Sequence, residues 1–568
     1  MTTTTTTETI IDLSNLNIFN IIVSIDDGVD LICFLLTCKR FYRIGRDSKT
    51  LQFKLQCLGT PLIASTKAPF GFKAFTPTMN AIIHRFHLTS FVNLFKRSTS
   101  NILVVGDSKV IVNQNHNDND ITHCILTHYN KFGDVPRSTT HLVIPEDALV
   151  SETLGVDILP PNIESLTLLD YYGQPIKQGD LPAKLKHLNI TLNQLLPGAL
   201  PSTLESLRFD GFDDFHTHTL APNMYSQCSR LTRLHLGLCQ LVLDPAYGRV
   251  PLSDLFPVTL LTHLSSYEEV SVTLLKECCN LEVLKVPHNN IKHIDLSKHF
   301  PKLWSLTLQS IRDDIDPQLS IPPSIKRLRL CLGRTNQSLK GVIPQGVEYL
   351  ILESYSQPVR KGDIPDSVKS LVWKTPNDPE LIVLPSNLQK LKLTYSYDQE
   401  PIIPSPLPPA LTKLVFGSSV QGDMKLSLPE TTTYLYFHVD HDTNIPQAFK
   451  GDCIPLHLKT LNLFVVFKQE SDDNTRICID DIIYHSNIDK LILTFYQTGQ
   501  VEFKIRRDNN NNNNNNNNIL MVDSESMFGG YLPIKGHQQQ QKKLYLDLQK
   551  RSPIQDTPYN IISLLLLD

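Results

Sequence analysis

One short phrase recurs along most of this chain. It consists of a leucine or isoleucine before a proline, an aliphatic residue three positions after the proline, and then Leu-x-Leu beginning three positions later. Residues 181–190 give the clearest copy, Leu-Pro-Ala-Lys-Leu-Lys-His-Leu-Asn-Ile. Copies are spaced by about 22 residues, a period that indicates a solenoid. Copies with the proline begin at Leu159, Leu181, Leu200, Ile321, Ile343, Ile364, Leu384, Leu407, Leu428 and Ile454.

Each copy predicts one turn with a short strand. In the clearest copy Leu188 and Ile190 alternate toward the core on that strand, and Leu185 enters the core just before it. Stacked turns then share one apolar ladder in a parallel sheet, with about 1.5–3 kcal/mol from each fully buried aliphatic side chain. We count about sixteen turns by this spacing. The ladder is expected to include Leu185, Leu188, Ile190, Leu284, Val286, Leu328, Leu330, Leu391 and Leu393.

Two kinds of known repeat resemble these copies. Residues 281–291 follow the leucine-rich-repeat pattern Leu-x-x-Leu-x-Val-x-x-Asn-x-Ile, which implies that Asn289 bonds the backbone of its turn. Residues 171–182 and 356–365 resemble the FNIP repeat, whose core is Phe-Asn-x-Pro-Ile followed by Gly-x-Leu-Pro. The resemblance implies an α/β fold, a leucine-rich-repeat-like solenoid with a parallel β-sheet on its concave face. The glycines of these two copies, Gly179 and Gly362, are expected at tight or left-handed bends.

Residues 13–57 predict two short amphipathic helices. Leu31, Leu35 and Cys38 share one face at helical spacing, and Ile32 widens the apolar stripe. The run Leu-Thr-Cys-Lys-Arg-Phe-Tyr at 36–42 resembles the F-box, although the usual Leu-Pro opening is absent. That resemblance implies docking on a Skp-type adaptor of a cullin-RING ubiquitin ligase. The contacting residues would be Leu31, Ile32, Leu35, Cys38 and Phe41.

The alternative for the same segment is a small N-terminal helical cap that closes the apolar end of the solenoid. Docking requires an exposed apolar stripe and capping requires a buried one, and the two functions are compatible. The expected organisation is a disordered tail at 1–12, the F-box-like segment at 13–57 and a connecting segment at 58–130 that contains a strand at 102–105. The solenoid follows at 131–503, then an Asn/Gln-rich disordered linker at 504–541 and a C-terminal segment at 542–568.

Composition and motifs argue against several function classes. The net charge of −4 lacks the basic excess of a nucleic-acid-binding protein. The eleven cysteines form no Cys-x-x-Cys pair, and we expect neither a signal peptide nor a membrane span, which favours a cytoplasmic or nuclear location. Gly106-Asp107-Ser108 resembles the nucleophile block of a lipase-like family but lacks that family's Asp-x-x-His, and the cluster at 438–442 is interpreted as a solvated turn rather than a metal site.

The predicted function is therefore binding without catalysis, cofactor or metal. A protein client on the concave face, and a Skp-type adaptor with its cullin, are the expected partners; nucleic acid and membranes are not. Trp373, Lys392 and Tyr395 are candidate exposed contacts for the client, since aromatic and charged side chains dominate interface energetics.

Overall fold

The computed structural model describes the repeat region and several later strands. The described residues are 102–105, 122–126, 131–144, 154–169, 175–190, 195–209, 225–237, 257–267, 272–292, 294–311, 321–332, 338–355, 357–374, 382–395, 404–419, 427–440, 455–466, 475–495, 499–507, 519–523, 529–532, 543–550 and 559–567. They belong to two compact units. One, here the solenoid unit, comprises residues 101–418 and 427–431; the terminal unit comprises the remaining residues. The predicted helices at 13–57 and the asparagine run lie outside the described residues.

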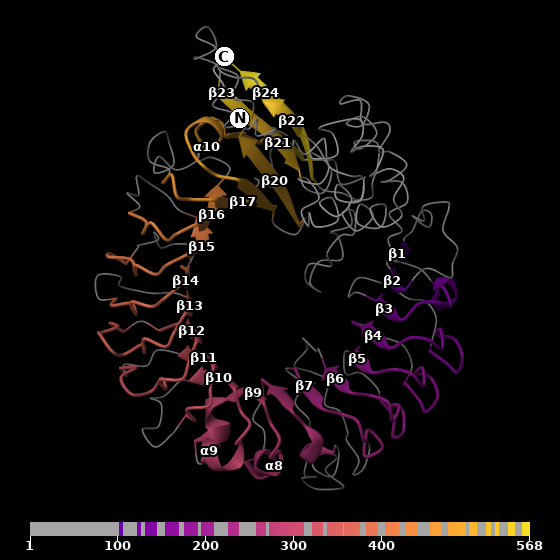
Figure 1. Ribbon diagram of the computed structural model, residues 1–568. Helices are drawn as coiled ribbons and strands as arrows, with labels where there is room; N and C mark the ends of the chain where they lie inside the picture. The colour runs from indigo at the N-terminus through magenta and orange to yellow at the C-terminus, as the bar shows by residue number, and fades with distance from the viewer. Residues whose placement is uncertain are drawn as a thin grey trace, which may run out of the picture. The chain divides into compact units, whose positions relative to one another are not determined.

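The solenoid unit is a parallel sheet in which each strand is hydrogen-bonded to the next strand along the chain. Its strands are β1 (Ile102–Val105), β2 (His123–Leu126), β3 (His141–Ile144), β4 (Ser165–Leu168), β5 (His187–Ile190), β6 (Ser206–Phe209), β7 (Arg233–Leu236), β8 (His263–Ser266), β9 (Val283–Pro287), β10 (Ser305–Ile311), β11 (Arg327–Leu332), β12 (Tyr349–Glu353), β13 (Ser370–Lys374), β14 (Lys390–Thr394) and β15 (Lys413–Ser419). In Figure 1 the connecting segments, with the short helices α8 (Val272–Glu277) and α9 (Leu296–His299), lie on the side of this unit away from the strands. The predicted parallel solenoid is confirmed.

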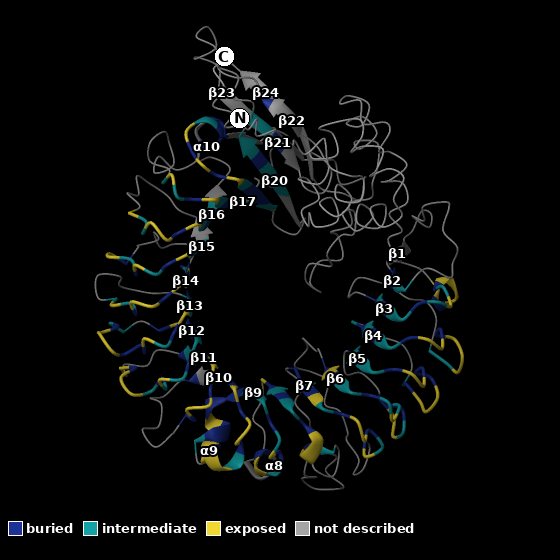
Figure 2. Ribbon diagram, in the orientation of Figure 1, coloured by how far each residue is buried: buried dark blue, intermediate teal, exposed yellow. Residues whose placement is uncertain are grey.

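The core is a ladder made by the second and fourth residues of the strands. These residues pair with one another in register from turn to turn, as Leu328 does with Leu350 and Leu330 with Leu352. All nine aliphatic residues expected in the ladder are no more than 2% exposed. Buried and less buried residues alternate along strands such as β5 and β11, and Figure 2 colours the described residues by burial. The single-residue alternation of a strand therefore separates a constant interior from a variable exterior.

Where the proline phrase occurs, it closes a hydrogen-bonded turn before the strand. The carbonyl of Pro182 accepts from the amide of Leu185 at 3.1 Å, and the carbonyl of Pro365 accepts from Val368 at 3.1 Å. Proline suits this position because its fixed φ presets the turn and its missing N–H leaves no donor to satisfy. The same bond recurs from Ile163, Leu204, Ile325, Val347, Leu388, Leu411 and Leu458 to the proline three residues earlier.

Polar side chains just before the ladder bind the preceding turn. Thr203 Oγ1 donates to the carbonyls of Ala183 and Leu185, both at 2.8 Å. Serine or asparagine makes the equivalent bond elsewhere, for example from Ser367 Oγ to the Val347 carbonyl at 2.8 Å. These side chains satisfy carbonyls that the sheet does not reach, so neighbouring turns are joined by more than the ladder. The set further includes Asn162, Asn280, Ser324, Asn387, Thr431 and Asn487.

The two FNIP-like copies make one distinctive bend. Gly179 and Gly362 have φ values of +92° and +89°, in the region that glycine favours, as the sequence predicts. The aspartate after each glycine folds back, and the Asp180 carboxylate accepts from the Lys177 amide at 2.7 Å. Asp363 does the same with the Arg360 amide at 2.8 Å. This role of the aspartates was not part of the sequence prediction.

The two asparagines after β9 differ in burial. Asn289, expected to bond the backbone of its turn, is exposed in the 3-10 helix His288–Ile291, whereas its neighbour Asn290 is only 3% exposed. Asn290 is thus the asparagine that this turn buries, and the backbone bond of Asn289 stays a prediction.

The terminal unit contains parallel strands followed by antiparallel ones. β16 (Tyr434–Asp440), β17 (Thr460–Val466) and β19 (Lys490–Phe495) are parallel, and β20 (Gly499–Arg507), β21 (Ile519–Asp523) and β22 (Gly529–Leu532) follow as antiparallel strands. β18 (Thr475–Cys478), β23 (Lys543–Lys550) and β24 (Tyr559–Leu567) form a separate antiparallel sheet. The Arg507 guanidinium donates to carbonyls of α10 (Asp480–Tyr484) and of Ile488, the latter at 2.6 Å. Burial lowers the pKa of Arg507.

Strands occur on both sides of the predicted solenoid bounds. β1 and β2 pair in parallel before residue 131; β1 is the strand expected at 102–105 in the connecting segment, whereas β2 was not expected. β21 and β22 fall within the predicted linker at 504–541, and their antiparallel pairing places them outside the repeat pattern. Neither pair carries the proline phrase on which the predicted bounds depend.

Candidate interaction surface

The first and third residues of β2 to β15 form the side of the sheet that faces away from the core ladder, here called the strand face. They alternate with the ladder residues and therefore point to the opposite side of each strand. The first residues are His123, His141, Ser165, His187, Ser206, Arg233, His263, Val283, Ser305, Arg327, Tyr349, Ser370, Lys390 and Lys413. The third residues are Ile125, Val143, Thr167, Asn189, Arg208, His235, Ser265, Lys285, Thr307, Arg329, Ile351, Val372, Lys392 and Val415.

The strand face carries positive charge and no acidic residue at these positions. Its Lys and Arg residues are Arg208, Arg233, Lys285, Arg327, Arg329, Lys390, Lys392 and Lys413, and histidine adds five further basic side chains. Over the whole chain, in contrast, Asp and Glu outnumber Lys and Arg by 57 to 53. Charge is thus segregated toward this face rather than spread evenly.

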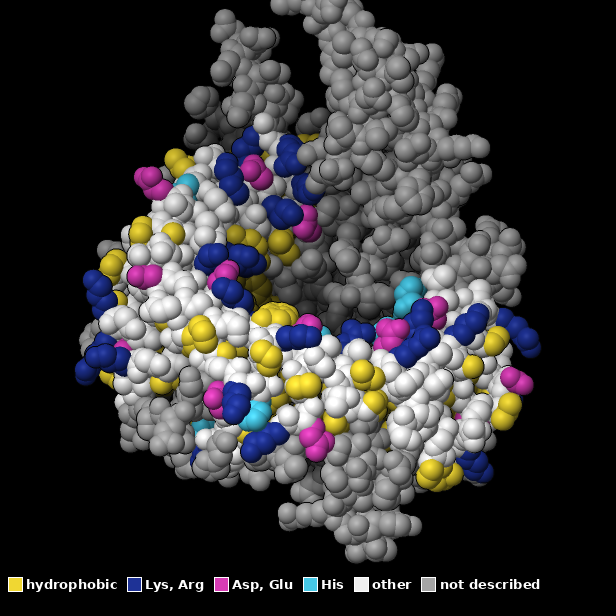
Figure 3. Space-filling model, turned by 60° about the horizontal axis from the view of Figure 1, so that its bottom comes forward, with side chains coloured by type: hydrophobic (Ala, Val, Ile, Leu, Met, Phe, Trp, Pro, Cys, Tyr) yellow, Lys and Arg dark blue, Asp and Glu magenta, His cyan; other side chains and the backbone are white. Residues whose placement is uncertain are grey.

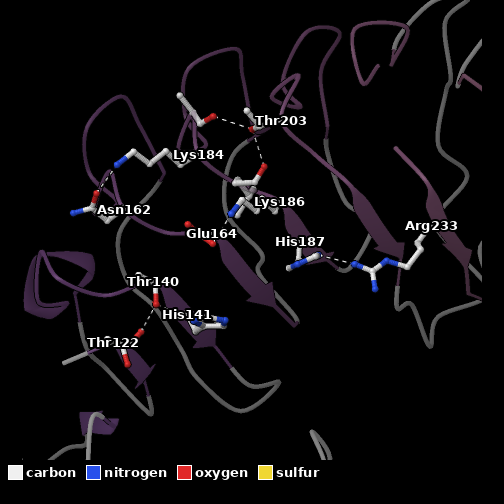
Figure 4. Close-up of polar contacts among 12 residues, drawn as sticks. Thr122, Thr140, His141, Asn162, Glu164, Lys184, Lys186, His187, Thr203 and Arg233 are labelled. Carbon is white, nitrogen blue, oxygen red and sulfur yellow. Dashed lines mark hydrogen bonds and ion pairs between the residues drawn. The ribbon is translucent and has the colours of Figure 1, made fainter. Parts of the chain in front are cut away.

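Acidic residues lie at the edge of the strand face, one position before the strands. Glu164 pairs there with Lys186 of the next turn at 2.8 Å (Figure 4), and Glu348 lies between Lys326 at 3.6 Å and Lys369 at 3.1 Å. Figure 3 shows clusters of Lys and Arg side chains with single Asp or Glu side chains beside them. Because these side chains are more than 40% exposed, each pair contributes little stability.

Histidines mark the first turns. The rings of His123 and His141 stack with centroids 4.3 Å apart. Burial, and then the charge of His141, lower the pKa of His123. Further along, a guanidinium nitrogen of Arg233 lies 3.3 Å from His187 Nδ1 (Figure 4), and burial followed by the Arg233 charge lowers the pKa of His187. Burial and the neighbouring positive charges thus favour the neutral forms of His123 and His187.

A charged network occupies the far end of β11 to β13. Glu353 accepts from Arg329 at 2.8 and 3.0 Å and from Cys331 Sγ at 2.9 Å, and it also pairs with Lys374. Burial alone would raise the pKa of Glu353, but these donors outweigh it and bring the pKa down to about 2. Burial raises the pKa of the Cys331 thiol to about 11, which leaves it unreactive as a nucleophile. The network places one carboxylate between two cations, Arg329 and Lys374.

The next two strands bring three lysines to the strand face. Lys390 and Lys413 are opposite each other in the register of β14 and β15, and Lys392 lies on the same face of β14. Burial first, and then the charges of Lys390 and Lys392, lower the pKa of Lys413. The register thus concentrates positive charge on two neighbouring strands.

The predicted client contacts have different positions. Lys392 is exposed on the strand face. Trp373 is 1% exposed because it is a ladder residue, opposite Leu352 and Leu393, and its Nε1 donates to the Tyr355 carbonyl at 3.3 Å. Tyr395 is 6% exposed. The expectation of exposure was therefore wrong for the two aromatic side chains, whose interior positions follow from the register. The five predicted adaptor contacts lie outside the described residues.

Other sequence candidates can be placed as well. His438 lies within β16, not in a turn after it, and its ring stacks on Phe464 with centroids 4.4 Å apart. In the part of the chain that the structure describes, no group of three or more His, Cys, Asp or Glu residues has metal-binding geometry. None of the described helices is long and apolar enough to cross a membrane.

Sequence reasoning missed the charge segregation, although the signal was present. Once the Leu-x-Leu register is known, the residues on either side of the first leucine can be read as rows. The rows show Lys390, Lys392 and Lys413 with no acid among them. Of these three lysines the prediction named only Lys392, because it treated each copy of the repeat separately.

Comparison with known proteins identifies the repeat. The FNIP Repeat family matches residues 152–193, 172–212 and 335–372. No curated protein matches the chain. Solved structures similar in part include the circular leucine-rich-repeat protein CroV588, 17% identical over 62% of this chain and 67% of that chain, with a TM-score of 0.27. The TLR13–ssRNA13 complex is 15% identical over 60% of this chain and 59% of that chain, with a TM-score of 0.34. YopM from Yersinia enterocolitica WA-314 is 14% identical over 74% and 97%, with a TM-score of 0.24.

Proposed function

We propose, from the FNIP repeats that this chain carries and the parallel solenoid they form, that the protein is a non-catalytic scaffold that binds another protein on its strand face. One observation carries the proposal. The ladder positions of successive strands are almost uniformly aliphatic or aromatic, while the positions of the strand face vary among basic, hydroxyl, amide and aliphatic side chains. The uniform ladder residues stabilise the fold, so the varied residues of the strand face are available for recognition of a partner.

A photo-crosslinking experiment tests this proposal. Benzoylphenylalanine at Thr307 places the reactive group on the strand face, and the same residue at Lys361 places it on an exposed connecting turn. A discrete protein adduct is expected from position 307 and not from position 361. Equal yields from both positions, or none from position 307, would count against the strand face as the binding surface.

The finer proposal is that the scaffold is a substrate receptor of a cullin-RING ubiquitin ligase. The support is the F-box-like sequence at 36–42 together with a downstream solenoid in the same chain. In this role the strand face holds the client and the N-terminal helices hold a Skp-type adaptor. The alternative is a scaffold whose N-terminal helices only cap the solenoid, with no link to ubiquitin.

Direct adaptor binding separates the two. The purified chain is titrated with a Skp-type adaptor, and the control carries Leu35→Asp and Phe41→Asp. Micromolar or tighter binding that the control abolishes supports the receptor. A folded chain that does not bind the adaptor leaves the scaffold with a helical cap, and the ubiquitin role is then rejected.

A further inference from the structure

An exposed tryptophan lies at the edge of the strand face, directly before β10. Trp304 is 43% exposed, whereas the other tryptophan of the chain, Trp373, is a ladder residue and 1% exposed. The backbone of Trp304 is fixed on both sides, because its amide donates to the Glu282 carbonyl at 3.0 Å. Its carbonyl accepts from the amides of Lys326 and Arg327, at 2.8 and 3.0 Å. One exposed apolar side chain needs no explanation by itself, so its neighbours are decisive.

Arginine and tyrosine follow on the next two strands. Arg327 and Tyr349 are the first residues of β11 and β12, directly opposite in register, and neither is buried. The Arg327 guanidinium carbon lies 4.8 Å from the centroid of the Tyr349 ring, so the ring face orients the guanidinium. We call Trp304, Arg327 and Tyr349 together the aromatic platform. Its three residue types are the ones that most often dominate the energetics of protein interfaces.

The spacing of the two aromatic residues matches a polyproline II helix. Trp304 and Tyr349 are two turns apart, which corresponds to about 9.6 Å across the strands. A polyproline II helix has three residues per turn and rises about 3.1 Å per residue, so side chains three residues apart recur on one side every 9.3 Å or so. Trp304 comes one residue earlier in its turn than Tyr349, so a segment that contacts both crosses the strands obliquely. Segments of this kind dock on aromatic side chains through their prolines.

The hydrogen-bonding groups of the aromatic platform are mainly donors. The Trp304 indole and the Arg327 guanidinium carry N–H groups and no acceptor. The glutamate at this edge, Glu348, is already held between Lys326 at 3.6 Å and Lys369 at 3.1 Å. A proline-rich segment is complementary, because proline has a carbonyl but no N–H, and the polyproline II backbone makes no internal hydrogen bonds.

Single-stranded nucleic acid is the alternative ligand, since its bases also stack on aromatic side chains beside cations. The charges around the aromatic platform favour the peptide. Along the edge, Glu282 lies one turn before Trp304 and Glu348 lies two turns after it. Four further cations of these turns are paired with Glu348 or Glu353. A phosphate chain across the platform meets these carboxylates, whereas the uncharged backbone of a proline-rich segment is not repelled by them.

We propose that the aromatic platform is the docking site for a proline-rich segment of a partner protein in the polyproline II conformation. This inference rests on the proposed scaffold function and specifies the chemistry of the partner. Prolines three residues apart pack on Trp304 and Tyr349. Carbonyls of the segment accept from the Trp304 indole and the Arg327 guanidinium.

The probe is a fluorescein-labelled peptide of four Pro-Ala-Ala repeats, titrated with the full chain by fluorescence polarisation. A peptide of four Pro-Ala-Ala-Ala repeats has the same number of prolines, but no two of them are three residues apart. The first peptide is expected to bind at least about tenfold more tightly, because only it places prolines on both aromatic side chains. Equal binding of the two peptides, or no binding of the first, overturns the proposal. Tighter binding of labelled oligouridylate than of the first peptide refutes the class of partner.

Matched aromatic variants locate the site. Trp304→Ala is expected to weaken binding of the Pro-Ala-Ala peptide by at least about tenfold, and Trp304→Phe, which keeps an aromatic face, by less. Tyr267→Ala removes an aromatic side chain with the same exposed fraction of 43%, at the end of β8, where Lys285 Nζ lies 3.9 Å from the ring centroid. This control is expected to leave binding within about twofold. Equal losses in Trp304→Ala and Tyr267→Ala refute the site.

The exposed tryptophan also reports docking in the unaltered chain, so the test does not depend on whether a variant folds. Because Trp373 is buried, acrylamide quenching of the tryptophan emission reports mainly on Trp304. The unlabelled Pro-Ala-Ala peptide is expected to reduce this quenching, since a bound proline covers the indole. Peptide binding without protection of Trp304 refutes the proposal. The photo-crosslink from Thr307 uses the natural partner instead of the peptide, so an adduct there without peptide binding rejects the proline-rich segment and retains the scaffold function.

Discussion

Replacing Leu391 by aspartate tests the ladder register most directly. Leu391 is 1% exposed and lies between Leu371 and Leu414 of the neighbouring strands. Loss of the buried leucine removes about 1.5–3 kcal/mol of transfer free energy. The new carboxyl group avoids the large cost of a buried charge by taking up a proton, but even a neutral polar group without a partner costs about 1–3 kcal/mol. The free energy of unfolding should therefore fall by at least about 2.5 kcal/mol.

The loss should be local at first, because turns of a solenoid depend mainly on their neighbours. Hydrogen exchange should accelerate in β13, β14 and β15, and limited proteolysis should cut within this block. Lys392→Asp is the matched control, since it alters the next residue of the same strand on the exposed side and should change stability by no more than about 0.5 kcal/mol. Wild-type protection in Leu391→Asp, or equal destabilisation by Lys392→Asp, would refute the assignment of inward and outward positions.

Three further outcomes are expected. The folded-state pKa of Glu353 is about 2, below its usual range, so its contribution to the free energy of unfolding is present above about pH 4.5 and is lost as the pH falls toward 2. Glu353→Gln should remove this pH dependence, which amounts to about 2 kcal/mol after allowance for solvent screening. Denaturation curves measured across that pH range test this. Gly362→Ala should lower stability by about 1–2 kcal/mol in thermal denaturation, because φ is +89° while the space around the residue is open. Because the pKa of His123 is lowered by burial and by His141, protonation opposes folding as the pH falls from about 6.5; His123→Asn should show a smaller loss of stability between about pH 7 and pH 5 than the wild type.

The repeat phrase was sufficient to predict the solenoid, because each element of it has a local physical cause. The proline carbonyl accepts from the amide three residues later, the leucines alternate with polar residues, and Gly179 takes a positive φ. Every one of these features is determined within a single turn and repeats from turn to turn. A pattern of this kind can be recognised without knowledge of distant contacts.

What the sequence did not show depends on relations between turns. Trp373 was expected to be exposed because of its residue type, yet the register with Leu352 and Leu393 places it in the core. β2 was missed because its ladder begins with Cys124 in place of leucine. The burial of Asn290 rather than Asn289 was likewise not visible in the repeat pattern. The grouping of Lys390, Lys392 and Lys413 likewise appears only when residues from adjacent turns are aligned.

The bonds that Ser, Thr and Asn side chains make to the preceding turn recur at equivalent positions along the solenoid. Each turn satisfies the carbonyls of its predecessor in the same way, so a whole turn can be inserted or removed while every remaining bond keeps an equivalent partner. Such an event would change the separation of two surface groups by one strand spacing, about 4.8 Å, without repacking the interior. The Glu353 network on β12 and the lysines of β14 and β15 are separated by such a number of turns. Gain or loss of turns can therefore adjust the distance between two recognition elements in discrete steps, independently of the substitutions that change their chemistry.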